Sequence, residues 1–292
     1  MLWSETNRKI AEIFEGGQLP TMVYISKQGY ERKKVLRSLH RHESICELLL
    51  IYRGEGSYQV EGKHYPLKEG SLIYYNQGDL HEVVSGSEHE IGSYCIGITN
   101  LQRKGLPRNH LVETGGPYVR QTGNLFPILR SMCEQMYELE GADEEGRLVA
   151  QLQCASFLVM TSRLKSFPTV AAQRTSEEQN VLRIRDYLNQ HFTENITLDM
   201  TAKDLGYSAT YVSHIFKNST GQTPIQYVIR RRVGLAQTLL ISTDFSATQI
   251  ATMVGYDNTN YFSTLFTRTT GMTPIRYRQL YKEEMKGTNR QS

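Results

Sequence analysis

The chain has 292 residues, a length that ordinarily forms two domains. Apolar residues make up 39% and charged residues 22%, a balance that excludes a disordered chain and is typical of a protein with a buried core. The longest mainly apolar run, residues 46–52, is far shorter than the roughly 18 residues that a membrane-spanning helix needs. The first ten residues lack the long apolar stretch of an export signal. We therefore expect a cytoplasmic protein with no membrane partner.

Cysteine spacing and charge distribution narrow the class further. The four cysteines, at positions 46, 95, 133 and 154, are spaced for neither a zinc ribbon nor a redox pair, so we expect reduced thiols. Residues 1–170 contain 19 Lys/Arg and 20 Asp/Glu, whereas residues 171–292 contain 14 and 10. A basic C-terminal part beside a neutral N-terminal part points towards a polyanion as partner.

Between about residues 23 and 98 the chain has the pattern of short strands separated by turns. Residues 57–61 alternate between polar and apolar types, and residues 48–52, 72–75 and 94–98 are short apolar runs. Glycine-containing turns lie between them, at residues 53–56, 61–63, 68–70 and 76–79. Strands spaced in this way predict an antiparallel sandwich or barrel.

The spacing of apolar residues becomes helical from about residue 122. The first predicted helix ends at Gly141 and has one apolar stripe, formed by Leu125, Leu129, Met132, Met136 and Leu139. A second helix is expected over residues 144–165, with its inward side formed by Leu148, Leu152, Ala155, Leu158 and Val159. The stripe exceeds what one face of a barrel needs to cover, so we expect a homodimer through residues 122–165; packing onto the barrel is the alternative.

Residues 166–176 contain one proline, small side chains and no periodic pattern, so they are the predicted linker. The sequence therefore predicts an α+β protein of two domains. Residues 1–165 form the β domain with its helical hairpin, and residues 177–292 form an all-helical domain.

The C-terminal part contains an internal repeat. Residues 206–216 match residues 255–266, with one extra residue in the second copy, and both copies continue to Gly-x-Thr-Pro-x-x-Tyr at 221–227 and 271–277. Two copies with a period of 49 to 50 residues are too few for a solenoid.

Each copy has the features of a helix-turn-helix, over about residues 197–218 and 246–269. Thr197 and Ser246 can cap a first helix, and Gly206 and Gly255 supply the turn. The second helix of each motif begins near residues 208 and 258, and we expect it to bury aromatic residues that include Tyr211 and Tyr261. Two ordinary helical hairpins are the alternative, but the duplication of turn, aromatics and polar face favours major-groove DNA binding.

The second copy is similar to the signature of the AraC/XylS family of bacterial transcription regulators. The matching residues are Ile250, Ala251, Val254–Tyr256, Tyr261–Ser263, Phe266, Gly271, Thr273, Pro274, Tyr277 and Arg278. The first copy matches as well, and the resemblance covers about residues 178–282. A basic residue that the family has after the second Phe is present as Lys217 but replaced by Thr267 in the second copy, where Arg268 is the neighbour.

The DNA-binding residues are predicted from the face that the core leaves free. In the first motif they are Ser208, Thr210, Ser213, His214 and Lys217. In the second motif they are Asn258, Thr259, Asn260, Ser263, Thr264, Thr267 and Arg268. Asn and Arg can pair with adenine and guanine edges, while Ser and Thr also bind phosphate. Arg232 is expected to tie the two motifs together.

His40, His42, Glu47 and His81, with the glycines at 54, 70 and 78, resemble the two motifs of the cupin barrel. Sensor domains of the AraC family have this fold. Three imidazoles and one carboxylate suit a divalent transition metal, although a metal-free pocket for a small organic effector is the expectation here. The predicted effector-binding residues are His40, His42, Glu47, Tyr52, Tyr58, Tyr74 and His81.

The resulting hypothesis is a DNA-binding transcription regulator that is not an enzyme and needs no cofactor. The resemblance implies double-stranded DNA, a small-molecule effector such as a carbohydrate, and RNA polymerase as partners, with transcriptional activation among the modes. A metal-dependent cupin enzyme with an appended helical domain is the alternative, but an oxygenase has no use for two tandem polar recognition helices.

Overall fold

The computed structural model describes residues 2–29, 38–61, 63–84, 91–162, 164 and 175–287. The chain forms two compact units. The N-terminal unit comprises Met1–Lys34, Arg41–Thr169 and Gly287–Ser292, and the C-terminal unit comprises Val35–His40 and Val170–Lys286. Of the predicted linker, residues 166–174 lie outside the described residues. No helix in the described part of the chain has the length and apolar character to cross a membrane.

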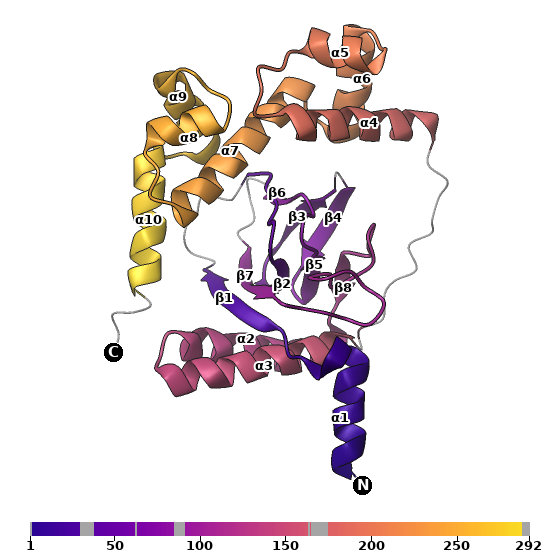
Figure 1. Cartoon of the computed structure of the whole chain (residues 1–292), viewed down its shortest axis with the longest axis vertical. Coiled ribbons are helices and arrows are strands. Elements are labelled where there is room, and N and C mark those ends of the chain that lie inside the picture. Colours follow the sequence, from indigo (N-terminus) through magenta and orange to yellow (C-terminus); the bar gives the residue numbers. More distant parts are fainter. Residues whose placement is uncertain are drawn as a thin grey trace. The chain divides into compact units, whose positions relative to one another are not determined.

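The N-terminal unit consists of antiparallel strands followed by a helical hairpin (Figure 1). It begins with α1 (Leu2–Ile13) and the short turn η1 (Glu15–Gly17). The strands are β1 (Thr21–Gln28), β2 (Cys46–Arg53), β3 (Glu55–Val60), β4 (Lys63–Lys68), β5 (Ser71–Tyr75), β6 (His81–Val84), β7 (Gly92–Thr99) and β8 (Val119–Gln121). The turn η2 (Gly123–Leu125) leads into α2 (Phe126–Glu140) and α3 (Glu144–Ser162).

The strands form two sheets, one in the order β1-β7-β2-β5-β8 and one in the order β4-β3-β6. All pairs are antiparallel, as the turn spacing predicts. Strand β2 is buried over residues 46–51 because it lies inside the larger sheet and has a covered surface on both faces. Its Cys46 side belongs to the core shared with α2 and α3, while its Glu47 side carries the polar groups described below.

Helices α2 and α3 pack on each other and against β1. The stripe of α2 faces the core of its own unit, where Leu129 and Met136 are fully buried together with their neighbour Cys133. The expected inward side of α3 is wrong in its first half, because Leu148 is 60% and Leu152 is 50% exposed. The apolar residues of this helix occur on several of its sides, so their periodicity does not identify the buried face. That face consists of Ala150, Cys154, Phe157, Leu158 and Thr161.

The C-terminal unit is helical (Figure 1). Its helices are α4 (Ser176–His191), α5 (Leu198–Leu205), α6 (Ala209–Thr220), α7 (Pro224–Ser242), α8 (Ala247–Met253), α9 (Thr259–Thr270) and α10 (Pro274–Gly287). Helices α4–α6 and α7–α9 repeat the same arrangement, and both α4 and α7 begin with a threonine capping box, at Thr175 and Thr223. The structural repeat therefore begins one helix earlier, at α4 and α7, than the repeat that the sequence showed.

A short segment from the first forty residues also belongs to the C-terminal unit. The backbone N–H of Ser38 donates to Oε1 of the buried Gln237, at 2.8 Å, and Arg231 donates to the carbonyl of Leu39. The segment lies so close to α7 that a Cβ atom on Gly234 would be 2.2 Å from the Leu39 carbonyl oxygen. Only glycine fits at this position of α7.

All four cysteines are free thiols, in agreement with the expectation of reduced cysteines. Cys46, Cys133 and Cys154 are buried in the N-terminal core, and burial raises the pKa of each thiol. Raised thiol pKa values make these groups poor nucleophiles, so they act as small core residues.

Candidate functional site

One row of paired residues across the larger sheet carries a group of polar side chains. Tyr24 on β1 faces Gly97 on β7, Gly97 faces Glu47 on β2, and Glu47 faces Tyr75 on β5. The Tyr24 hydroxyl donates to Oε1 of Glu47 across the intervening strand. This reach depends on Gly97, because a Cβ atom there would lie 2.4 Å from a carbon of the Tyr24 ring. The row is therefore built around the missing side chain of Gly97.

Two imidazoles meet the other oxygen of the same carboxylate. Nε2 of His42 and Nε2 of His81 each lie 3.2 Å from Oε2 of Glu47, and the two rings have centroids 5.5 Å apart. The ring of Tyr75 stacks on His81 at 4.2 Å, and Tyr58 lies 5.1 Å from Tyr75. Strands of both sheets thus contribute to one buried polar cluster, and His42, Glu47 and His81, which the sequence predicted together, do meet.

Burial and charge have opposite effects on these groups. Burial opposes ionisation of Glu47, but the charge of His42 and hydrogen bonds from both imidazoles outweigh it, so the pKa of Glu47 lies well below its ordinary value. Burial raises the pKa of Tyr58 and of Tyr75 well above the usual range, and their hydroxyls remain neutral. The cluster therefore offers a carboxylate, imidazoles and neutral phenols, a set that can both accept and donate hydrogen bonds.

The donor set also suits a metal ion. One ligand atom from each of His40, His42, Glu47 and His81 lies within 4.8 Å of the others. Nδ1 of His40 lies 2.8 Å from the Ser38 carbonyl oxygen, and Nδ1 of His81 lies 2.8 Å from the Asp79 carbonyl oxygen. A carbonyl oxygen can only accept a hydrogen bond, so each of these contacts places a proton on Nδ1. Metal-binding histidines are usually oriented by a second-nitrogen contact of this kind.

Two of the tyrosines predicted for the effector site lie on the opposite face of the larger sheet. The Tyr74 hydroxyl donates to the Thr161 carbonyl of α3, and Tyr52 contacts Arg130 of α2 and donates to the Gln28 carbonyl. Tyr58 lies with the cluster, beside Tyr75. Tyr24 is a member that sequence reasoning missed, because only the pairing of β1 with β7 brings it near Glu47.

The C-terminal unit contains two helix-turn-helix motifs, α5–α6 and α8–α9. Thr197 and Ser246 cap the first helices, and Gly206 and Gly255 make the turns with φ of 73° and 91°. The short side chains of the buried residues 202 and 251, both alanine, allow the helices of each motif to cross closely.

Arg232 on α7 holds the two motifs in a fixed relation. Its guanidinium donates to the carbonyls of Phe192 and Glu194, in the connection between α4 and α5, and to the carbonyl of Gly255 in the second turn. It also lies over the ring of Tyr256, 4.7 Å from the centroid. Three carbonyl contacts and one aromatic contact from a single side chain confirm the expected role of Arg232.

The predicted DNA-binding residues fall into three groups by exposure and by position in their helices, the last group being two exposed N-caps. Thr210, His214 and Lys217 on α6, and Asn260, Thr264 and Arg268 on α9, are exposed. Ser213, Thr259, Ser263 and Thr267 are half-buried, and the Thr267 hydroxyl donates to the Ser263 carbonyl. Ser208 and Asn258 are N-caps whose side chains accept backbone N–H groups of their own helices. The six exposed residues of the first group form the polar faces of α6 and α9.

The expectation that Tyr211 and Tyr261 are buried is wrong. Tyr211 is 36% and Tyr261 is 55% exposed, while the next residues, Val212 and Phe262, are fully buried. Of the adjacent aromatic residues Tyr261 and Phe262, only the phenylalanine lies in the core.

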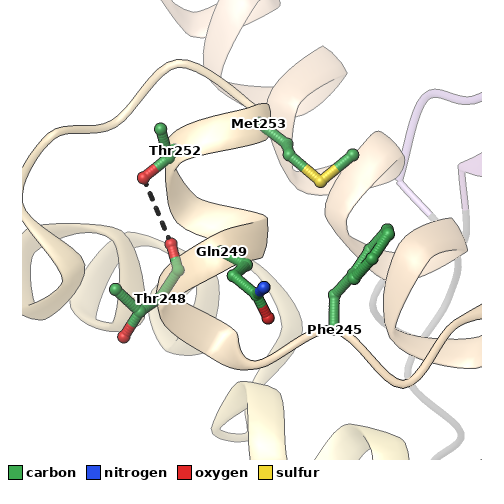
Figure 2. A pocket seen from close by; sticks show the side chains of 5 residues that line it. All are labelled: Phe245, Thr248, Gln249, Thr252 and Met253. Atoms are coloured by element: carbon green, nitrogen blue, oxygen red, sulfur yellow. Dashed lines mark hydrogen bonds between the residues drawn. The ribbon is translucent and has the colours of Figure 1, made fainter.

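A shallow pocket of about 370 Å³ lies on the second motif, beside α8. Figure 2 shows its lining side chains, which come from α8 and the loop before it: Phe245, Thr248, Gln249, Thr252 and Met253. Phe245 and Met253 are exposed apolar residues, and none of the predicted DNA-binding residues lines the pocket.

Comparison with known proteins gives matches in both units. The AraC-like ligand binding domain family matches residues 22–158, and a helix-turn-helix domain family matches residues 201–280. The uncharacterized HTH-type transcriptional regulator YdiP of Escherichia coli is 23% identical over 246 residues, which cover 83% of this chain and 81% of YdiP. The HTH-type transcriptional activator RhaR of Enterobacter sp. is 28% identical over 232 residues, covering 77% of this chain and 80% of RhaR.

The lactose operon transcription activator of Staphylococcus xylosus is 24% identical over 218 residues, covering 74% of this chain and 77% of that protein. These relatives are transcriptional regulators matched over most of their length. The family matches assign a ligand-binding domain to the unit with the polar cluster and a helix-turn-helix domain to the unit with the duplicated motif. The chain thus belongs to the AraC family of DNA-binding transcriptional regulators.

Proposed function

We propose that the protein is an effector-responsive regulator whose helices α6 and α9 enter two successive major-groove segments on one face of DNA. The observation that carries this proposal is the Arg232 contact set, which holds two equivalent motifs in one rigid unit. Major-groove segments on one face recur about every 10 base pairs, so a protomer reads a site of two short elements one helical turn apart.

The proposed contacts are the exposed residues of α6 and α9. Asn260 and Arg268 are of the types that pair with adenine and guanine edges, whereas Lys217 is suited to phosphate. The test is a genomic selection with the full chain. Recovery of one motif with two elements about a turn apart supports the proposal, and recovery of no motif contradicts it.

The N-terminal unit is the proposed effector domain, with a cupin-like barrel as its architecture. The hydrogen-bonding groups of Glu47, His42, His81 and Tyr24 support a small hydroxyl-rich ligand. A carbohydrate is the proposed class, because one relative is named for the lactose operon. A thermal-shift screen of sugars tests this, since a ligand at a hundred times its Kd stabilises by about 2.7 kcal/mol. Glu47→Gln is the variant in which the shift should disappear.

A metal-binding effector domain is a second candidate. The Nδ1 contacts of His40 and His81 to backbone carbonyls favour it, because metal-binding histidines are usually oriented by such a contact of their other ring nitrogen. A bound divalent ion would supply a Lewis acid for the hydroxyl groups of an effector. Elemental analysis of protein purified without added metal distinguishes the two candidates. One equivalent of zinc, iron or manganese, lost in His42→Ala and His81→Ala, selects the metal.

A homodimer through the hairpin α2–α3 is the proposed assembly. Since the stripe of α2 is buried in its own unit, the surface that remains is the exposed apolar side of α3, formed by Leu148, Val149 and Leu152. We propose that α3 of a second copy covers this surface. Sedimentation at micromolar concentration measures whether the protein is a dimer. Transcriptional activation, the mode named for two of the relatives, further implies RNA polymerase as a partner. In vitro transcription from the selected site tests activation.

A further inference from the structure

The helices α6 and α9 each carry a tyrosine at the third position after the N-cap. Tyr211 follows Ser208, and Tyr261 follows Asn258. In both helices the N-cap oxygen accepts the backbone N–H of this tyrosine, so the tyrosine belongs to the first helical turn. Both rings also pack near the tyrosine of the preceding turn, at 5.3 Å from Tyr207 and 5.9 Å from Tyr256. The two positions are therefore structurally equivalent.

The two hydroxyls nevertheless have different surroundings. Asn180 on α4 donates from Nδ2 to the Tyr211 hydroxyl at 2.9 Å, and its Oδ1 accepts from the Tyr207 hydroxyl at 2.7 Å. Helix α7 takes the place of α4 in the second copy: Arg183 lies over Tyr207 as Arg232 lies over Tyr256. On that alignment the counterpart of Asn180 is Ile229, which has no polar side-chain atom. Within the described residues no side chain takes the role of Asn180 towards Tyr261.

Tyr261 also begins the exposed polar face of α9. Tyr261, Thr264 and Arg268 are spaced i, i+3 and i+7, the spacing of one side of a helix, and all three are exposed. Asn260, whose amide is of the type that reads adenine, is the adjacent residue. An extended phenol at the N-terminal end of a recognition helix is therefore placed beside the groove and its flanking backbone.

We propose that Tyr261 is a DNA-contacting residue whose hydroxyl donates a hydrogen bond to a backbone phosphate and so fixes how α9 sits in its groove. This rests on the proposed DNA-binding role of α9. A phenol is a single neutral donor, which suits a phosphate oxygen better than the paired edge of a base. Tyr211 is a positioning residue in this scheme, because its hydroxyl is held by Asn180. The second motif thus has a tyrosine contact to phosphate that the first motif lacks.

The test compares the full-length wild type with Tyr261→Phe on a selected duplex and on duplexes with one methylphosphonate at a time. Tyr261→Phe is expected to bind about tenfold more weakly, on all sequences alike, as for loss of one hydrogen bond to a charged acceptor. On the duplex that lacks the charge of the contacted phosphate, the two proteins should differ by less than twofold. The slope of affinity against salt should not change, because a phenol displaces no counterion.

Tyr211→Phe is the matched control, and it should show no single phosphate at which its effect disappears. If Arg268→Ala weakens binding while Tyr261→Phe binds within twofold of wild type, the proposal is overturned and the DNA-binding role of α9 stands. If wild type selects no duplex at all, the DNA-binding role itself fails. A loss of affinity in Tyr261→Phe that is equal on every methylphosphonate duplex and accompanied by a lower Tm would make the residue structural, and would also overturn the proposal.

Discussion

Gly97→Ala is expected to disrupt the polar cluster of the N-terminal unit without changing any of its polar residues. The added Cβ would lie 2.4 Å from one carbon of the Tyr24 ring and 2.6 Å from another, distances that real contacts do not reach. Tyr24 is only half-buried, so its ring can turn away, but it then loses its hydrogen bond to Glu47. Gly97 lies within β7, paired on both sides, so the strand itself has no other reason to exclude alanine.

The expected loss of stability has two parts. A hydrogen bond to a charged group contributes about 1.5–3 kcal/mol, and forcing an extra carbon into a packed site costs about 1–3 kcal/mol. Gly97→Ala should therefore lower the free energy of unfolding of this unit by about 2.5–6 kcal/mol. Tyr24→Phe, which removes the hydroxyl alone, should lower it by about 1.5–3 kcal/mol.

Urea unfolding followed by circular dichroism in the β-sheet region measures this loss, because all the described strands belong to the N-terminal unit. In a Tyr24→Ala background the ring is absent, so Gly97→Ala should cost less than about 1 kcal/mol there. Equal costs of Gly97→Ala in the two backgrounds would refute the reasoning, since they would show that the alanine acts through something other than Tyr24.

Three further outcomes follow from single residues. Arg232→Gln should weaken binding to a two-element DNA site by tenfold or more while leaving one-element affinity within about threefold, measured by gel shift, because it frees one motif from the other. Burial raises the pKa of Asp79 to about 6, so the stability of the wild type is fully present below pH about 4 and is partly lost as the pH rises through about 6. Asp79→Asn does not titrate, so its free energy of unfolding relative to wild type should rise by about 2–3 kcal/mol across that window, measured by urea titration. A difference that stays constant with pH would contradict this. Leu148→Asp should sediment as a folded monomer, whereas Leu129→Asp should unfold the hairpin; a dimer that persists in Leu148→Asp excludes the proposed interface.

The sequence predicted best what local chemistry determines. The helices α5, α6, α8 and α9 begin within about a residue of expectation, and α6 and α9 end one or two residues beyond it, because caps and left-handed glycines mark these helices. The meeting of His42, Glu47 and His81 was also anticipated, through a resemblance rather than from spacing.

What the sequence did not determine depends on contacts between distant segments. Tyr24 reaches Glu47 only through the pairing of β1, β7 and β2, which no local pattern encodes. Leu148 was assigned to the wrong side of α3 because apolar residues surround that helix. Tyr261 was expected in the core together with Phe262, but packing buries the phenylalanine and leaves the tyrosine exposed.

The segment Ser38–His40 limits how the chain can be divided into stable fragments. Since it supplies hydrogen-bond partners to Gln237 and Arg231 and lies against Gly234, the C-terminal unit is discontinuous in sequence. A fragment that starts at residue 175 retains the helices α4–α10 but exposes the amide of Gln237, which is fully buried in the full chain. Such a fragment should be less stable than the same unit within the whole chain, and a synthetic peptide spanning Ser38–His40 should bind it and restore part of the loss, as in fragment complementation.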